Sequence, residues 1–251
     1  GNEDDKQLVG LALHRLLLVL CTSHKHGVIF HDKSIGTSGK KYNELIETVL
    51  EFMNQPWEDE LRRELTLKIL VTCPDLFRNF VTRIHSYLKP RNSISWFKTI
   101  KFLKEVISSM NAEAYLKSQD GSFSKDQLTS MIKNLTVPST VLRMARKAIL
   151  TPDDMDVCYM LIELLLTMLN GLHSFMSSVE KFQLLSQRDL EDMKAAIQTY
   201  LMENSPTGEA LLLVWKKATS HPKAKTLART QQSHPLALLD LLSLLHQCCP
   251  Q

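Results

Sequence analysis

Apolar side chains recur three and four residues apart along most of the chain, which is the spacing of one face of an α-helix. The clearest case is the face formed by Trp96, Ile100, Leu103 and Ile107. No segment combines alternating apolar and polar positions with a tight hairpin turn. The pattern therefore predicts an all-α chain of about ten or eleven helices. Their apolar stripes are expected at 8–19, 45–52, 61–70, 76–87, 96–107, 141–149, 155–169 and 190–201.

Capping residues and prolines indicate where these helices begin and end. Thr72-Cys73-Pro74-Asp75 and Thr151-Pro152-Asp153-Asp154 each place a capping residue, a proline and an acid at a predicted helix start. Asn170-Gly171 is expected to interrupt the apolar helix that follows residue 155. Three further starts are predicted at Ser124–Gln127, which has the form of a capping box, at Ser186–Asp189 and at Ser205-Pro206.

Two apolar runs need a test against the membrane, Leu8–Cys21 and Met155–Leu169. The first contains His14 and Arg15, and the second is shorter than the roughly 20 residues of a membrane span. We predict that both are buried helices and that the chain has no membrane partner.

Glycine and proline number only 8 and 9 in 251 residues, which argues against a sandwich or barrel of short strands. The predicted helices average about 45 residues per pair, the spacing of HEAT or armadillo-like repeats. We therefore expect one α-helical repeat domain over 1–251, an α-solenoid, with loops at 24–41, 117–124 and 218–234. A compact orthogonal bundle is the structural alternative. The missing initiator methionine and the apolar helices at both ends predict a fragment of a longer solenoid.

Candidate reactive groups are sparse. The five cysteines, an odd number placed mostly in apolar stretches, are expected to be buried, reduced thiols. Cys21-x2-His24-x-His26 matches no standard zinc module. Gly36–Lys40 lacks the spacing of a phosphate-binding loop. No catalytic motif is present, so we predict no enzyme activity, no cofactor, no metal and no small-molecule substrate.

Charge is distributed unevenly along the chain. Residues 61–150 carry 16 basic and 6 acidic side chains, whereas the whole chain has a net charge of +3. No acid lies between Leu76 and Lys104, and Tyr87, Trp96 and Phe97 lie among the cations of that window. Such a stretch favours RNA or an acidic partner, although a plain solvated face is the alternative. The candidate binding residues are Arg78, Arg83, Lys89, Arg91, Lys98, Lys101 and Lys104, with a second cluster of Arg143, Arg146 and Lys147.

Several short motifs occur in a characteristic order. They are His26–Phe30, Tyr42–Leu45, Arg63–Leu70, Cys73–Leu76 and Ser95–Phe97. This succession resembles the N-terminal helical region of the nucleolar pre-ribosomal-associated (Npa/Urb) family, with Asp75 where that family usually has Glu. The resemblance covers about 26–110. It implies that Gly27, Phe30, Asn43, Pro74 and Leu76 determine the fold.

The resemblance also implies a function. Proteins of this family are long α-solenoid scaffolds of the nucleolus that act in early assembly of the large (60S) ribosomal subunit. Their partners are pre-ribosomal RNA and pre-60S assembly factors, including an RNA helicase. The alternative is a HEAT-type protein–protein adaptor in transport or signalling, without RNA binding. Binding to RNA phosphates would weaken steeply with salt, which separates the two.

Overall fold

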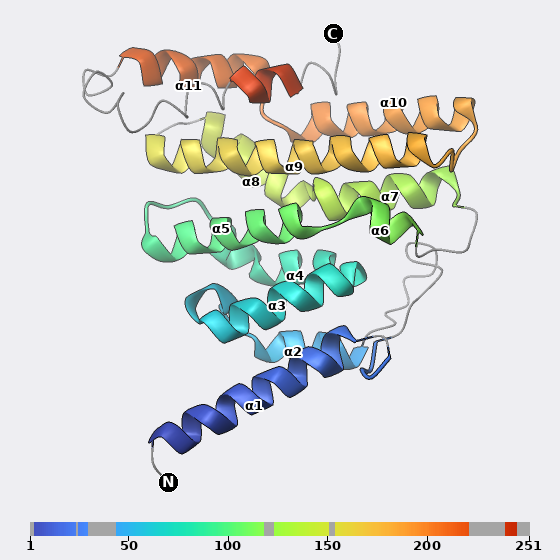
Figure 1. Ribbon diagram of the computed structural model, residues 1–251. Helices are drawn as coiled ribbons and strands as arrows, with labels where there is room; N and C mark the ends of the chain where they lie inside the picture. Colours follow the sequence, from blue (N-terminus) through green and yellow to red (C-terminus); the bar gives the residue numbers. More distant parts are fainter. Residues whose placement is uncertain are drawn as a thin grey trace.

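The computed structural model describes residues 3–23, 25–29, 44–117, 123–150, 154–220 and 239–244, and these are helices joined by turns, with no strand (Figure 1). This part of the chain contains eleven complete α-helices and three 3-10 helices, and residues 239–244 are also helical. The α-helices are α1 (Glu3–Thr22), α2 (Glu44–Phe52), α3 (Glu60–Thr72), α4 (Phe77–Arg83), α5 (Ile94–Ser109), α6 (Ala112–Lys117), α7 (Lys125–Thr136), α8 (Ser139–Leu150), α9 (Met155–Lys181), α10 (Gln187–Asn204) and α11 (Gly208–Ser220). The 3-10 helices are η1 (Pro56–Glu58), η2 (Pro74–Leu76) and η3 (Ile84–Leu88).

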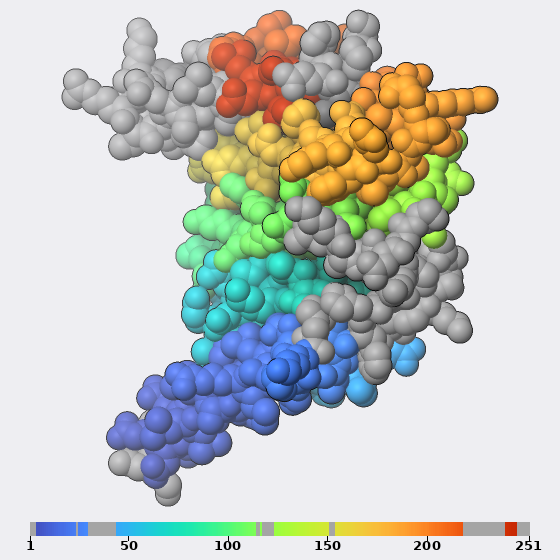
Figure 2. Space-filling view, turned by 45° about the vertical axis from the view of Figure 1, so that its right-hand side comes forward, coloured from blue at the N-terminus to red at the C-terminus, as the bar shows by residue number. Residues whose placement is uncertain are grey.

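The helices are stacked in chain order, from α1 at one end to α11 at the other (Figures 1 and 2). One row consists of α1 against α3, α3 against α5, and α5 against α9. Beside it, α7 contacts α4, α9 and α10, while α8 packs on α9, α10 and α11. Buried apolar side chains of the described residues form one continuous cluster through this stack. The predicted all-α class is therefore confirmed.

Side-chain caps fix several helix starts as the sequence predicts. Ser124 accepts a hydrogen bond from the amide of Gln127, whose side chain accepts one from the amide of Ser124, which is a complete capping box. Ser186 caps α10 through the amide of Asp189. Four side chains of the predicted stripe of that helix are buried: Leu190, Met193, Ile197 and Leu201.

Other helix boundaries differ from the prediction. Thr72 does not cap a new helix, because it is the last residue of α3 and its hydroxyl donates to the Lys68 carbonyl at 2.7 Å. Asp154 alone caps α9 within the described residues, since Thr151–Asp153 lie outside them. The helix predicted at Ser205-Pro206 begins at Gly208, with the Thr207 hydroxyl accepting from the amide of Ala210.

The buried faces of the first two helices were predicted wrongly. In α2, the core receives Ile46 and Leu50, while Leu45 is 68% and Phe52 is 79% exposed. Both faces of this short helix are apolar, so periodicity alone cannot choose between them. In α1, the inward side chains are His14 and Cys21. Most of its other large apolar side chains are exposed, and the helix projects from the end of the stack (Figure 1).

The central helix, α9, is continuous across Asn170-Gly171, against the predicted interruption. A methyl group at Gly171 would meet Ile107 and Thr136 side chains at ordinary contact distances, so the helix passes close to both α5 and α7. Among the described residues, α9 is the one helix long and apolar enough to span a membrane. The prediction that it is a core helix is supported by its packing on α5, α6, α7 and α8.

The predicted loops fall largely outside the described residues. This holds for His24 and 30–41 of the first loop, for 118–122 of the second and for 221–234 of the third. The short helix α6 was not predicted. Its six residues are too few to show a period.

Candidate nucleic-acid interface

The ten predicted cations lie on α4, on the connector after η3, on α5 and on α8. Six of them are exposed and form no ion pair with a described carboxylate: Arg78, Arg83, Lys89, Arg91, Lys101 and Arg143. Their environments differ, and this divides the predicted patch into cations that hold helices together and cations that face a hollow in the surface.

Two lysines of α5 are engaged in ion pairs. Lys98 contacts the Glu58 carboxylate at 2.6 Å, and Lys104 contacts Glu163 of α9 at the same distance. The window from Leu76 to Lys104 contains no acid, but neighbouring helices supply the carboxylates. These two lysines therefore join helices, and most of their charge is balanced locally.

Two arginines of α8 bind the end of α10. The Arg143 Nε donates to the Asn204 side-chain oxygen at 2.9 Å, and Arg146 donates to the Glu203 carbonyl oxygen. Neither partner is a carboxylate. These bonds therefore join α8 to α10 without balancing the positive charge of either guanidinium group.

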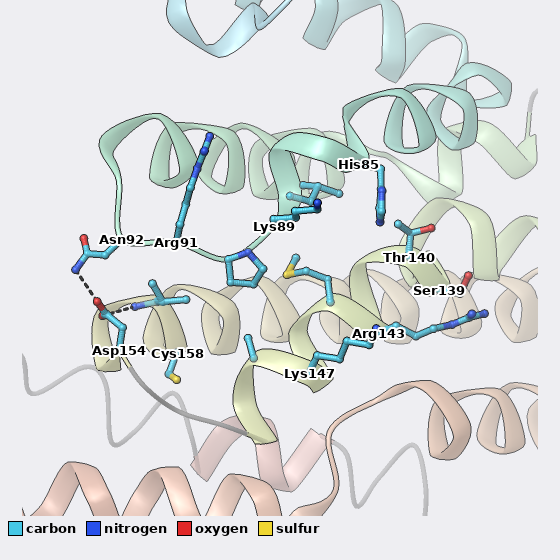
Figure 3. Close-up of a pocket in the computed structure, with 15 residues that line it drawn as sticks. His85, Lys89, Arg91, Asn92, Ser139, Thr140, Arg143, Lys147, Asp154 and Cys158 are labelled. Atoms are coloured by element: carbon cyan, nitrogen blue, oxygen red, sulfur yellow. Dashed lines mark hydrogen bonds between the residues drawn. The ribbon is translucent and has the colours of Figure 1, made fainter.

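Four predicted cations come together around one hollow, which we call the basic groove. Lys89 and Arg91 lie on the connector after η3, and Arg143 and Lys147 lie on α8 across from it (Figure 3). The groove has a volume of about 790 Å³. Two separate clusters of the sequence thus form one surface, because α8 packs against η3.

The described lining of the groove consists of an apolar floor, polar and basic side chains and one acidic residue. Leu88, Met144, Val157 and Cys158 contribute the floor and are nearly inaccessible to solvent. The acid is Asp154 at the first turn of α9. A hollow of this kind presents cations around buried apolar side chains.

Hydrogen bonds satisfy the Asp154 carboxylate. It accepts from the Asn92 side chain at 2.6 Å and from the amides of Asp156 and Val157 (Figure 3). Partial burial by itself would raise the pKa of this carboxyl, but these hydrogen bonds outweigh it and hold the pKa below its usual value. Asp154 is thus an ionised helix cap, and its oxygens are directed to their donors.

Sequence reasoning missed His85 and Asn92, which also line the groove. Both lie in the acid-free stretch from Leu76 to Lys104. Their proximity in sequence to Lys89 and Arg91 is the feature from which they could have been predicted. The hollow itself had no signal in the sequence, because it depends on how α8 packs against η3.

The aromatic residues of the basic window are structural. Trp96 is completely buried, and its indole nitrogen donates to the Leu88 carbonyl at 3.3 Å. Phe97 packs edge-on against Trp96, and Tyr87 packs edge-on against Trp57. The described lining of the groove contains no Phe, Tyr or Trp on which a base could stack.

Three of the five cysteines lie in described residues, and all three are buried and outside any disulfide, as predicted: Cys21, Cys73 and Cys158. Burial, with smaller contributions from Asp75 and Cys21, raises the pKa of Cys73 to about 12. This thiol is therefore protonated and unreactive at neutral pH. No group of three potential metal ligands occurs in the described part of the chain. His24, Gly36–Lys40, Cys248 and Cys249 lie outside it.

The residues of the family-like motifs mostly build the fold. Gly27 closes the C-terminal end of α1: a methyl group there would lie 2.4 Å from the Ser23 carbonyl oxygen and 2.5 Å from that of Leu20. Pro74 begins η2, and Leu76 is buried in the core, as the resemblance implies. Phe30 and Asn43 lie outside the described residues.

Comparison with known families agrees with these motifs. Residues 1–99 match the model of the Npa1 family, described as the ribosome 60S biogenesis N-terminal region. The match contains Gly27, Pro74 and Leu76 and one wall of the basic groove, with His85, Lys89 and Arg91.

Two curated proteins similar to this chain carry the name nucleolar pre-ribosomal-associated protein 1. The mouse protein (Mus musculus) is 32% identical over 106 residues, which is 42% of this chain and 5% of the relative. The human protein (Homo sapiens) is 28% identical over 138 residues, 55% of this chain and 6% of the relative. The matched part is thus about one-twentieth of each relative. Both names place those proteins in the nucleolus, in agreement with the predicted localisation. No solved structure is significantly similar to this chain.

Proposed function

We propose that this chain is a structural, non-enzymatic part of a nucleolar scaffold protein that acts in early assembly of the large (60S) ribosomal subunit. The observation that carries the proposal is the match of residues 1–99 to the Npa1 family. Within that match, the characteristic residues turn a chain or fill a core, as Gly27 and Leu76 do. These motif residues build a helical framework.

The framework suits a repeat architecture. Stacking in chain order, with α1, α3, α5 and α9 in one row, supports an α-solenoid of HEAT or armadillo-like pairs over 1–251 (Figure 1). In a solenoid each pair of helices contacts mainly its neighbours. Such an array presents a long surface on which several partners can assemble.

The proposed partners are pre-ribosomal RNA and pre-60S assembly factors, including an RNA helicase. The excess of basic residues at 61–150 supports the RNA partner, because polyanionic RNA is attracted to a positive surface. The exposed apolar side chains of α1, among them Leu8 and Leu13, support protein partners.

Affinity purification of the tagged full-length protein from cells tests the proposal. We expect precursors of the large-subunit RNA to co-purify, with precursors of the small-subunit RNA as the control for specificity. Deletion of 44–109, which removes α2 to α5, should abolish that enrichment. Recovery of protein partners from transport or signalling, with no large-subunit precursor, would instead favour the adaptor function.

A further inference from the structure

We propose that the basic groove binds the phosphodiester backbone of a short single-stranded RNA segment. The inference rests on the proposed function for the identity of the polyanion, and it assigns that binding to one hollow in the molecule. Its walls are the connector after η3, with Lys89 and Arg91, and α8, with Arg143 and Lys147 (Figure 3).

The charge balance of the groove favours an anionic ligand. Among its described lining residues, four exposed, positively charged side chains and His85 face the one carboxylate of Asp154. That carboxylate already accepts hydrogen bonds from Asn92 and two backbone amides. It therefore does little to neutralise Lys89 and Arg91.

Two of the four cations have no protein partner in the described part of the chain. Lys89 and Arg91 form no ion pair with any described residue, whereas Lys98 and Lys104 of the neighbouring α5 are paired with Glu58 and Glu163. Cations held in ion pairs would have to give up a carboxylate before binding a phosphate. Lys89 and Arg91 carry no such cost, so they are the preferred contacts.

The volume of the groove favours single-stranded RNA over a duplex. A volume of about 790 Å³ is within the range of small-ligand pockets and is far too small for a duplex. It suits a few nucleotides of a single strand. Cations on two facing walls can contact successive phosphates of one strand.

The lining predicts weak base selectivity. Sequence-specific recognition of single-stranded RNA uses aromatic stacking and hydrogen bonds to base edges. The groove has a floor of Leu88, Met144 and Val157, with no Phe, Tyr or Trp among its described residues. We therefore expect oligouridylate and oligoadenylate to bind with similar affinity.

The test measures binding of fluorescein-labelled oligouridylate to the full chain by fluorescence anisotropy at several salt concentrations. The variant K89Q/R91Q removes two groove cations. Its matched control, R78Q/K101Q, removes two exposed cations from α4 and α5 that also form no ion pair with described residues. The four side chains are exposed, so neither double variant should shift the thermal unfolding midpoint measured by circular dichroism.

We expect K89Q/R91Q to weaken binding by about tenfold or more, as the loss of two charge-assisted contacts implies. The slope of log K against log salt should become shallower by about 1.4, at about 0.7 per phosphate contact on a single strand. R78Q/K101Q should change the affinity by less than about threefold, because it alters only the long-range field.

Three results would overturn the groove assignment: equal losses in the two double variants, unchanged affinity in K89Q/R91Q, or no RNA binding by the wild-type chain. Poly-glutamate is included as a competing probe. Tight binding of poly-glutamate that K89Q/R91Q abolishes, without RNA binding, would assign the groove to an acidic protein and also overturn the proposal. Co-purification with large-subunit precursors is a separate experiment. A lack of co-purification would count against the proposed function, whereas the anisotropy results decide the groove assignment.

Discussion

Gly27 closes the end of α1 with backbone atoms alone. Its amide donates to the Ser23 carbonyl at 2.8 Å, and the next amide, that of Val28, donates to the Leu20 carbonyl at 2.9 Å. The space for a side chain is occupied by the carbonyl oxygens of Val19, Leu20 and Ser23. Backbone oxygens in a helix end cannot move aside without breaking these hydrogen bonds, so a glycine is required there.

Gly27→Ala should therefore destabilise the chain by about 1–3 kcal/mol, the usual cost of forcing an extra carbon into filled space. Gly10→Ala is the matched control, because Gly10 lies inside α1 with nothing near its absent side chain. That change should stabilise the chain by about 0.5–1 kcal/mol through helix propensity. Urea unfolding followed by circular dichroism measures both. Wild-type stability in Gly27→Ala would contradict this account of the turn.

Residue-scale predictions from sequence succeeded where a local rule applies. The Ser124 capping box, the Ser186 cap and the buried Trp96 depend on residues close in the chain, and the structure confirms all three. Thr72 shows the limit of such rules. A threonine before Cys-Pro is typical of a helix cap. The Thr72 hydroxyl instead donates to the Lys68 carbonyl within α3, and η2 starts without a side-chain cap.

At the scale of elements, α9 depends on Asp154 for its N-terminal cap. The carboxylate accepts from the amides of Asp156 and Val157, two of the donors that a helix start leaves without partners. Because the pKa of this carboxyl is lower in the folded chain than its ordinary value of 3.8, the ionised form stabilises the fold. That contribution is present above about pH 3.8 and is lost as the pH falls through the folded pKa.

Asp154→Ala should consequently cost about 1 kcal/mol of unfolding free energy near neutral pH, within the range of lost N-caps. The cost should shrink when the pH is lowered from 7 to about 3, below the ordinary pKa of 3.8, because part of the stabilisation by the ionised carboxyl is lost there. Asp154→Asn, which keeps an oxygen acceptor, should retain most of the cap at both pH values. Urea titrations of the three proteins measure these differences. A cost for Asp154→Ala that is the same at both pH values would show that the ionised carboxylate contributes nothing.

Elements were predictable where one face was clearly apolar. The stripe of α10 is buried as expected, whereas α2 buries Ile46 and leaves Leu45 in solvent. The sequence of α2 offers two apolar faces, and only packing in the folded chain decides which of them is buried. Asn170-Gly171 likewise predicts a break in the helix. In the structure α9 is continuous there, and Gly171 lies close to the side chains of Ile107 and Thr136.

At the scale of the whole molecule, the candidate site could be predicted only in part. The sequence identified Lys89, Arg91, Arg143 and Lys147 as basic residues in two separate clusters. It could not show that α8 brings the clusters to one groove, nor that Glu58 and Glu163 pair with Lys98 and Lys104. Both facts depend on contacts between residues 40 to 60 positions apart.

In the proposed function, the helical framework contacts large-subunit precursor RNA through the basic groove. Ultraviolet crosslinking of the full-length protein in living cells, followed by mass spectrometry of the RNA-linked peptides, tests that claim most directly. We predict crosslinked peptides that contain residues 85–92 or 139–148, joined to RNA from large-subunit precursors. Crosslinks to those precursors confined to other parts of the chain, or no crosslinks to them at all, would contradict the claim.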